Sequence, residues 1–266
     1  MDQELKLTVV TVVKDDSTGF ERTFNSLNVA LGDLDSHERG SVEYVVIDSS
    51  TNTNEIPELI RSESIPTQLR WVEPHGVYSA MNAGLGVAQG KYVYFLNAGD
   101  QLFGPGSLHL ILEALANEPA WVFGQVIFQG SNGVEATSSF DYQSEKKHFF
   151  GRGKFPAHQG TIAARIDIER LGGFDAGYKI AADYKLLLQL SQFADPIEIE
   201  HPVATFHLGG ISSSMWQESL EEFHQARVEV FELKGAALVA EQFRWRTLFV
   251  KMWLARKLGR VSSESK

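Results

Sequence analysis

The chain contains no cysteine in its 266 residues and only eight prolines. Without cysteine it can form no disulfide, no cysteine-containing zinc or iron–sulfur site and no thiol nucleophile. No apolar run approaches the ~20 residues that cross a bilayer. The first residues are polar and acidic, so we expect no secretory signal. These absences exclude a small disulfide-stapled fold, and they predict a cytoplasmic protein.

Basic residues are scarce except at one end of the chain. The chain has 24 Lys and Arg residues and 34 Asp and Glu residues, which gives a net charge of −10. Residues 243–266 hold seven basic residues and one acid, so this tail carries +6 and residues 1–242 carry −16. An acidic body argues against general nucleic-acid binding, because binding phosphates requires basic patches.

The basic tail also carries large apolar side chains, among them Trp245, Phe249 and Trp253. Basic residues interleaved with aromatic ones suit the surface of an anionic membrane, and we expect contact through residues 243–260. The alternative is a C-terminal helix packed on the rest of the chain or on another subunit. Val250 lies opposite the main apolar stripe of this helix, so the amphipathic pattern is imperfect.

Strand-like and helix-like patterns alternate through the first hundred residues. Residues 7–13, 42–47 and 92–96 are apolar runs typical of buried strands, and helical spacing lies between them. This alternation predicts an α/β fold with a doubly wound, mostly parallel, Rossmann-like sheet, whose ligand site lies beyond the carboxyl ends of the strands. Later residues predict a short α+β extension, with a helix at about 182–193, and helices from residue 215 onward.

Sequence motifs follow one another at the ends of these expected strands. Taken together and in order, they resemble the family 2 glycosyltransferases of GT-A fold over roughly residues 7–212, and most of all the branch that assembles bacterial surface polysaccharides, of the colanic-acid type. The matching segments are Val-Val-Lys-Asp-Asp (12–16), Val-Ile-Asp-Ser-Ser-Thr (46–51), Gly-Val-Tyr-Ser-Ala-Met-Asn-Ala-Gly (76–84), Phe-Leu-Asn-Ala-Gly-Asp (95–100), Pro-Ala-His-Gln-Gly (156–160), Gly-Gly-Phe-Asp (172–175), Ile-Ala-Ala-Asp-Tyr (180–184) and Gly-Gly-Ile-Ser (209–212).

The resemblance implies an organisation and an activity. Residues 1–214 would form a GT-A catalytic domain, with a nucleotide-binding half at about 1–100 and an acceptor half at about 101–214, and residues 215–266 a helical C-terminal segment. The chain would be an inverting enzyme that moves a sugar from a nucleotide-diphosphate sugar, by preference a UDP-sugar, to a hydroxyl of a surface-polysaccharide or lipid-linked glycan. Such acceptors imply a place on the inner face of the cytoplasmic membrane.

The resemblance also implies a donor site at the strand ends. Asp48 can accept a hydrogen bond from a uracil-like or guanine-like base, although a strand-end aspartate also forms local turns. Asp15 can instead cap the following helix. The residues expected at the donor nucleotide are Thr11, Val13, Asp15, Asp48, Asn82 and Asn97.

One acid in the resemblance corresponds to a metal ligand. Asp100 matches the last acid of the Asp-x-Asp element that binds Mn²⁺ or Mg²⁺ across the donor phosphates. This chain reads Asn97-Ala98-Gly99-Asp100, with a single carboxylate, so we expect modest metal affinity. His207 is a weaker candidate ligand, because a lone histidine at a strand end is as often structural.

Asp183 corresponds to the general base of the family, which removes the proton of the acceptor hydroxyl. Asp183 also opens a helix, where a carboxylate can accept backbone N–H groups as a cap. The two roles conflict, because N–H donors stabilise the carboxylate anion and make it a weaker base. The resemblance places further residues on the acceptor side or in a flap over the donor: His158, Gln159, Gly209, Gly210 and Ser212.

Other functions stay open at this point. A non-catalytic sugar-nucleotide-binding module is one, because the metal motif has a single acid. A nucleotidyltransferase is another, although no Gly/Arg/Lys-rich loop follows the first strand. Hydrolysis by the carboxylate pair Asp100 and Asp183 is a third.

Overall fold

A computed structural model describes residues 4–61, 65–130, 135–138, 141–143, 155–207 and 215–258. Its strands form a nine-stranded sheet in the order β3-β2-β1-β4-β8-β6-β9-β5, with β7 paired to β6. The strands are β1 (Leu7–Val13), β2 (Val42–Asp48), β3 (Thr67–Trp71), β4 (Tyr92–Phe95), β5 (Gln101–Leu102), β6 (Trp121–Gln129), β7 (Glu135–Thr137), β8 (Thr161–Ala164) and β9 (Ile197–His207).

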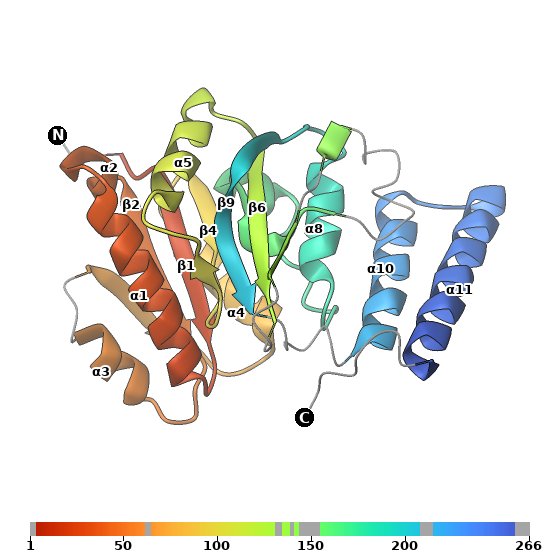
Figure 1. Cartoon of the computed structure of the whole chain (residues 1–266), viewed down its shortest axis with the longest axis horizontal. Coiled ribbons are helices and arrows are strands. Elements are labelled where there is room, and N and C mark those ends of the chain that lie inside the picture. Colours follow the sequence, from red (N-terminus) through yellow and green to blue (C-terminus); the bar gives the residue numbers. More distant parts are fainter. Residues whose placement is uncertain are drawn as a thin grey trace.

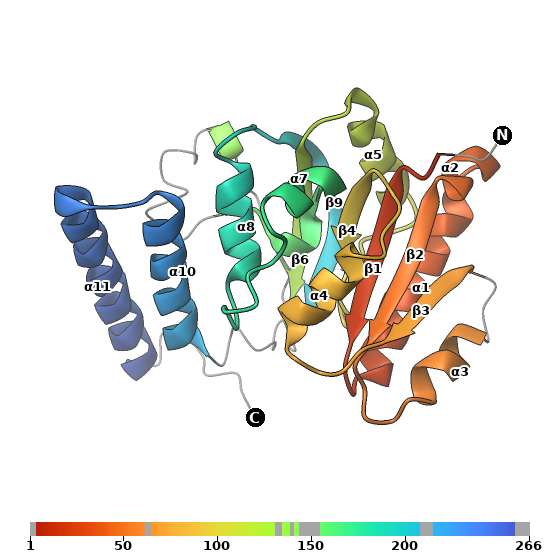
Figure 2. The same ribbon diagram turned by 180° about the vertical axis from the view of Figure 1, so that it is seen from behind.

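Helices cover both faces of this sheet (Figures 1 and 2). They are α1 (Ser17–Asp33), α2 (Ser36–Gly40), α3 (Glu55–Arg61), α4 (Val77–Leu85), α5 (Ser107–Ala114), α7 (Arg165–Arg170), α8 (Ala182–Leu190), α10 (Trp216–Val230) and α11 (Gly235–Lys257), with short 3-10 turns η1 (Leu115–Asn117) and η2 (His158–Gly160). The expected α/β class with a doubly wound, mostly parallel sheet in its first half is confirmed, because β3, β2, β1 and β4 all run parallel.

Strand β1 shows why the sheet needs cover on both faces. All seven of its residues are buried. Because side chains alternate along a strand, Val10 and Val12 pack in the core under α4 and α8, whereas Val9 and Val13 pack in the core under α1 and α5. Close packing also demands a glycine in α4, since a Cβ on Gly84 would lie 2.4 Å from Val10 Cγ1.

The second half of the sheet is mixed, as the expected α+β extension requires. Strand β8 pairs antiparallel with both β4 and β6, and β6 runs parallel to β9. The short strand β5 and helix α5 have no counterpart in the sequence-based expectation. Strand β9 starts at Ile197, and its first half alternates apolar and charged residues instead of forming one apolar run.

The C-terminal residues form a helical hairpin at one end of the molecule (Figure 1). Helix α10 packs on α8, and α11 lies beside α10 on its outer side. The chain reverses after Phe231, where Glu232 adopts a left-handed φ of 47°. No helix within the described ranges is both long and apolar enough to cross a membrane.

Candidate functional site

A cleft of about 450 Å³ opens at the carboxyl ends of the parallel strands. Val13 at the end of β1, Ser49 after β2 and Asn97 after β4 contribute to its wall. Gly76 and Val77, at the start of α4, form the opposite side. The cleft therefore lies where the doubly wound topology predicts a ligand site.

Lys14 brings the cleft a positive charge, because it follows β1 directly and lines the wall. Sequence reasoning did not single it out, although its position at a strand end was visible. Asp16 also lines the wall, and its carboxylate caps α1 by accepting the N–H of Gly19 at 2.8 Å. The helix cap is thus Asp16 rather than Asp15.

The expected donor residues occupy different positions around this cleft. Val13 and Asn97 line it. Asp15 is not among its lining residues and instead ties the ends of β1 and β2 together: its carboxylate accepts the N–H of Thr51 at 2.7 Å, and its own N–H donates to Ser50 Oγ at 2.9 Å. The backbone φ of 51° at Asp15 is left-handed, a conformation that this cross-loop bonding stabilises.

Three other expected donor residues are held by the protein itself. Asp48 is buried, and its carboxylate accepts the N–H of Ser50 at 2.8 Å, the local turn that was the alternative to base recognition. The buried Thr11 hydroxyl donates to the carbonyl of Leu96 at 2.8 Å. Asn82 uses both ends of its amide on the backbone of residue 174, at 2.7 and 2.8 Å. Contact of these side chains with the donor stays a prediction. In the structure Asn82 joins α4 to the backbone at residue 174.

The loop that follows β4 carries Asn97 and Asp100 in a tight turn. The N–H of Asp100 donates to the carbonyl of Asn97 at 2.9 Å, and Gly99 adopts a φ of 97° that favours glycine. Thr23 of α1 holds this turn from below: its hydroxyl donates to the carbonyl of Asp100 at 2.6 Å and accepts the N–H of Gly99 at 3.0 Å. Thr23 therefore supports this turn, a role that no sequence motif indicated.

The side chains of this turn offer two oxygen groups to a ligand. Burial raises the pKa of Asp100 to about 8, an effect that the nearby N–H of Asn97 partly opposes. The Oδ1 atom of Asn97 is buried without a hydrogen-bond partner among the described residues. A buried carboxyl beside an orphaned carbonyl oxygen fits a hard divalent cation, which takes oxygen ligands.

His207 lies close to this turn in the fold. Its Nε2 is 2.7 Å from Oε1 of Gln101, the residue after Asp100. Burial lowers the pKa of His207, and the charge of Arg22 lowers it further. The described part of the chain holds no cluster of three or more His, Asp or Glu side chains arranged to bind a metal. A cation at this turn would therefore depend on donor phosphates, as the single acid predicts.

Asp183 lies at the start of α8, where Tyr78 of α4 reaches it. The Tyr78 hydroxyl donates to the carbonyl of Ile180 at 2.5 Å and to Asp183 Oδ1 at 3.0 Å, so the two acceptors share its one proton. Burial and the neighbouring carboxylate of Asp183 raise the pKa of Tyr78, so this hydroxyl stays protonated and donates. Sequence reasoning placed Tyr78 in a matching motif but gave it no role.

An aromatic cluster surrounds the Asp183 region. His158 in η2 stacks on Phe95 with ring centroids 6.3 Å apart, and Phe174 contacts both rings edge-on. Burial lowers the pKa of His158, while the charge of Asp183 partly raises it. The Nε2 atom of His158 is buried and finds no hydrogen-bond partner in the described ranges.

Strand β4 connects the two groups of candidate residues. Phe95, its last residue, contacts His158, and the turn that carries Asn97 and Asp100 follows two residues later. Tyr94 links the same parts from the other face, since its hydroxyl donates to the carbonyl of Gln159 at 2.7 Å. Burial, and then the carboxylate of Asp100, raise the pKa of Tyr94. The fold thus brings the expected metal, base and acceptor residues to one end of β4. The expected flap residues Gly209, Gly210 and Ser212 lie outside the described residues.

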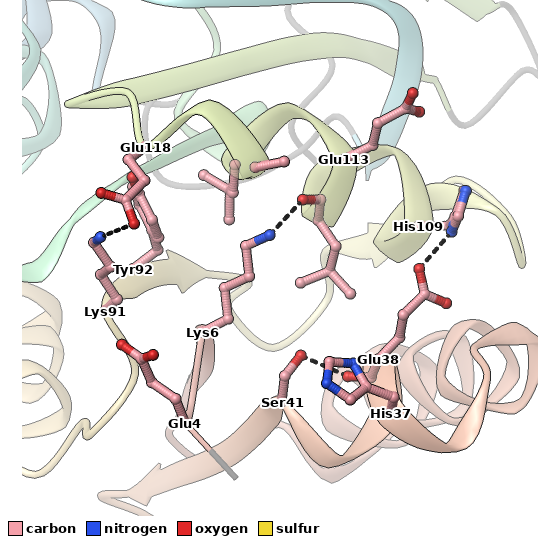
Figure 3. Close-up of a pocket in the computed structure, with 13 residues that line it drawn as sticks. Glu4, Lys6, His37, Glu38, Ser41, Lys91, Tyr92, His109, Glu113 and Glu118 are labelled. Atoms are coloured by element: carbon pink, nitrogen blue, oxygen red, sulfur yellow. Dashed lines mark hydrogen bonds and ion pairs between the residues drawn. The ribbon is translucent and has the colours of Figure 1, made fainter.

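A second hollow, of about 610 Å³, lies at the opposite edge of the sheet (Figure 3). Its walls include residues just before β1 and β4, which are the amino ends of parallel strands. The charged groups bond across it: Lys91 with Glu118 at 2.6 Å, and His109 with Glu38 at 2.8 Å. Lys6 donates to a backbone carbonyl of α5 at 2.9 Å. These pairings, and its position, separate this hollow from the candidate site.

Two solved glycosyltransferases share this arrangement of helices and strands. TarS of S. aureus (residues 1–349), in complex with UDP, superposes with a TM-score of 0.62 at 16% identity, covering 97% of this chain and 76% of that one. The mannosyltransferase PcManGT of Pyrobaculum calidifontis, in complex with GDP-Man and Mn²⁺, gives a TM-score of 0.64 at 15% identity, covering 96% and 76%. The fold is that of the GT-A glycosyltransferases.

Sequence similarity identifies the family within this class. The model of glycosyl transferase family 2 matches residues 8–171, which is more than half of the chain. The glycosyltransferases MT1564 and Rv1514c of two Mycobacterium tuberculosis strains are each 28% identical over 213 residues, covering 78% of this chain and 77% of theirs. The chain belongs to glycosyl transferase family 2 and is a glycosyltransferase.

Proposed function

We propose that the chain is an inverting glycosyltransferase that moves a sugar from a nucleotide-diphosphate sugar to a hydroxyl of a surface-polysaccharide or lipid-linked glycan. A UDP-sugar is the first choice of donor, because TarS is solved with UDP and with UDP-GlcNAc, whereas PcManGT is solved with GDP-Man. The observation that carries the proposal is the carboxylate of Asp183, oriented by Tyr78 near the end of β4 that carries the donor-side turn.

In this mechanism Asp183 acts on the acceptor. A carboxylate oxygen of Asp183 takes the proton of the acceptor hydroxyl while the oxygen forms a bond to the anomeric carbon. The bond from that carbon to the donor diphosphate breaks on the opposite face, and the diphosphate leaves with the electron pair. A single displacement of this kind inverts the anomeric centre and needs no protein nucleophile.

The donor half of the site must accept the charge of the leaving diphosphate. Lys14, which lines the cleft, supplies one positive charge there. Asp100 and Asn97 are the residues that would hold Mn²⁺ or Mg²⁺, with His207 as a weaker third. Such a cation, when bound, neutralises charge that develops on the leaving group.

Donor binding and transfer test the proposal. A panel of UDP-, GDP- and dTDP-sugars is titrated with and without Mn²⁺ or Mg²⁺, and release of the nucleotide diphosphate is followed. Asp183→Asn should bind donor normally and lose transfer by at least ~100-fold, the usual contribution of a general base. The control is Asp33→Asn, at the exposed end of α1. Full transfer by Asp183→Asn would refute the base.

The metal site is tested separately. Asp100→Asn should remove the dependence of donor affinity on Mn²⁺, and retained dependence would refute the metal role. A non-catalytic sugar-nucleotide-binding module is the second candidate function, because the turn has a single acid. It predicts donor binding without transfer to any glycan acceptor, and without slow release of nucleotide diphosphate.

We further propose that α11 contacts an anionic membrane. Its inner face packs on α10, where Trp245 stacks on His224 and Phe249 contacts Trp216 with the two rings tilted. Its outer face holds a second apolar stripe, exposed to solvent, which includes Phe243, Val250 and Leu254. Helix α11 lies on the outside of the hairpin in both views (Figures 1 and 2).

The positive charge of α11 favours an anionic membrane as the surface that this apolar stripe contacts. The exposed basic residues Arg244, Arg246 and Lys251 lie along the same helix, in the segment that carries +6. Basic and apolar residues on one exposed helix bind anionic lipid surfaces. A triple variant that combines Phe243→Ser, Val250→Ser and Leu254→Ser should no longer co-sediment with vesicles containing phosphatidylserine. The control is Val29→Ser, because Val29 is an exposed residue of α1. Unchanged vesicle binding by the triple variant would refute the proposal.

A further inference from the structure

Glu222 of α10 binds the segment that leads into the candidate base. Its carboxylate accepts three consecutive backbone N–H groups, those of Lys179 at 2.9 Å, Ile180 at 2.8 Å and Ala181 at 2.9 Å. Asp183 follows two residues later. A side chain from the C-terminal hairpin therefore fixes the backbone just before the candidate base.

This contact resolves the conflict between the two roles of Asp183. Ala181 is the cap residue of α8 and has no side chain that can accept an N–H group. Because the first N–H groups of a helix have no partner inside it, another acceptor must serve the start of the helix. Glu222 takes the N–H of Ala181 and the two before it, while the N–H groups of Ala182 and Asp183 face the Tyr78 hydroxyl. The Asp183 carboxylate is left to bond with Tyr78.

Other residues of α10 bind the same segment on either side of Glu222. Glu229 accepts the hydroxyl of Tyr178 at 2.9 Å and pairs with Lys185. Arg227 donates to the hydroxyl of Tyr184 at 3.2 Å. Residues before and after Asp183 are thus bound to one helix, and Glu222 is the contact that holds the backbone N–H groups just ahead of Asp183.

We propose that Glu222 is a positioning residue for the transfer reaction, which sets the orientation of Asp183 by occupying the N–H groups ahead of it. This inference rests on the proposed role of Asp183 as the base. Glu222 does not line the donor cleft, so its effect should fall on the transfer step and not on donor binding. Without Glu222 the freed N–H groups compete for the Asp183 carboxylate and turn it from the acceptor.

Graded substitutions of Glu222 test this inference on the full chain. Glu222→Gln keeps one acceptor oxygen and should lower kcat ~10-fold, whereas Glu222→Ala keeps none and should lower it ~100-fold, as expected for lost charge-assisted hydrogen bonds. The Kd for the donor, and the KM of donor and acceptor, should stay within about twofold. Glu221→Gln is the matched control, because Glu221 is the exposed neighbour on α10.

Two outcomes of this comparison overturn the inference. One is unchanged kcat in Glu222→Gln and Glu222→Ala. The other is a parallel loss of donor affinity and kcat in the conservative variant Glu222→Gln, which would indicate general loss of structure. The thermal unfolding midpoint of each variant identifies chains that are unfolded at the assay temperature, and Glu222→Gln decides the matter if Glu222→Ala does not fold.

A double substitution separates this inference from the proposed function. If Glu222 acts through Asp183, adding Glu222→Gln to Asp183→Asn should change the residual transfer rate by less than about twofold. A further ~10-fold loss would overturn the positioning role while leaving the base intact. Full activity in Asp183→Asn alone would overturn the base, and with it the role of Glu222.

Discussion

The hydroxyl of Tyr78 donates to the carboxylate of Asp183 at 3.0 Å, across 105 residues of chain. Tyr78 lies on α4, beside the donor cleft, and Asp183 lies on α8. The ring of Tyr78 stacks on Phe174, with centroids 5.9 Å apart, so the position of the hydroxyl is fixed by packing as well as by its hydrogen bond. One hydrogen bond therefore joins α4, at the wall of the candidate cleft, to the candidate base.

Removing only this hydroxyl should slow transfer. Tyr78→Phe keeps the ring and its stacking but frees the Asp183 carboxylate to rotate. We expect kcat to fall ~10-fold or more, since a hydrogen bond to a charged group contributes about 1.5–3 kcal/mol. Donor affinity should stay within twofold. Tyr92→Phe is the control, because it removes a hydroxyl that bonds to the carbonyl of Pro119, at the other edge of the sheet. Equal kcat in Tyr78→Phe and wild type would contradict the prediction.

The turn that carries Asp100 should depend on Thr23. Thr23→Val is nearly isosteric, but it removes the hydroxyl that bonds the carbonyl of Asp100 and the N–H of Gly99. We expect a loss of ~10-fold in Mn²⁺-dependent donor affinity, because the buried backbone groups lose their partner and the turn loosens. Isothermal titration of UDP with Mn²⁺ measures this change. Thr67→Val, which removes a local bond at the edge strand β3, should leave the affinity unaltered.

Much of this fold could be predicted from residue patterns. The buried strand β1 runs from Leu7 to Val13 as its apolar run predicted, because both faces of a central strand are covered and every side chain is apolar or Thr. The half-exposed start of β9 could not be delimited in the same way, since charged and apolar residues alternate there. Local composition identifies the centre of the sheet better than its edges.

The candidate site shows a similar division. Asp100 and Asp183 could be selected because each follows a strand or opens a helix within a matching motif. Thr23, Tyr78 and Glu222 could not, since their roles arise from contacts 77, 105 and 41 to 43 residues away in the sequence. Such contacts depend on the packing of helices α1, α4 and α10, which no local pattern specifies.

His158 should make stability dependent on pH. Burial lowers its pKa below the ordinary value of 6.5, so between the two values the unfolded chain binds a proton that the folded chain does not. The contribution of His158 to the free energy of unfolding is therefore complete above about pH 6.5, and it is lost as the pH falls below that value. His158→Gln should remove this contribution, so the free energy of unfolding of the variant relative to the wild type should rise as the pH falls from 7 to 5 in urea denaturation. His201→Gln, on the exposed part of β9, should retain the contribution of His158. An unaltered pH dependence in His158→Gln would contradict this prediction.

The packing of α11 on α10 should depend on a buried ion pair. Arg227 of α10 donates from Nε to Glu241 of α11 at 2.7 Å, and their side chains are only 6% and 3% exposed. Glu241→Gln leaves the guanidinium without a counter-charge, so the free energy of unfolding should fall by about 3 kcal/mol. Urea denaturation of this variant, with the exposed Glu218→Gln as control, measures the loss.

Replacing both partners separates pairing from burial. The double variant Arg227→Met with Glu241→Leu removes both charges and keeps apolar volume between α10 and α11. It should recover most of the stability lost in Glu241→Gln, because desolvation of the two charges offsets much of their attraction. It should also lose the contact of Arg227 with the Tyr184 hydroxyl, next to Asp183. If the double variant is less stable than Glu241→Gln, the ion pair contributes net stability and this interpretation is wrong.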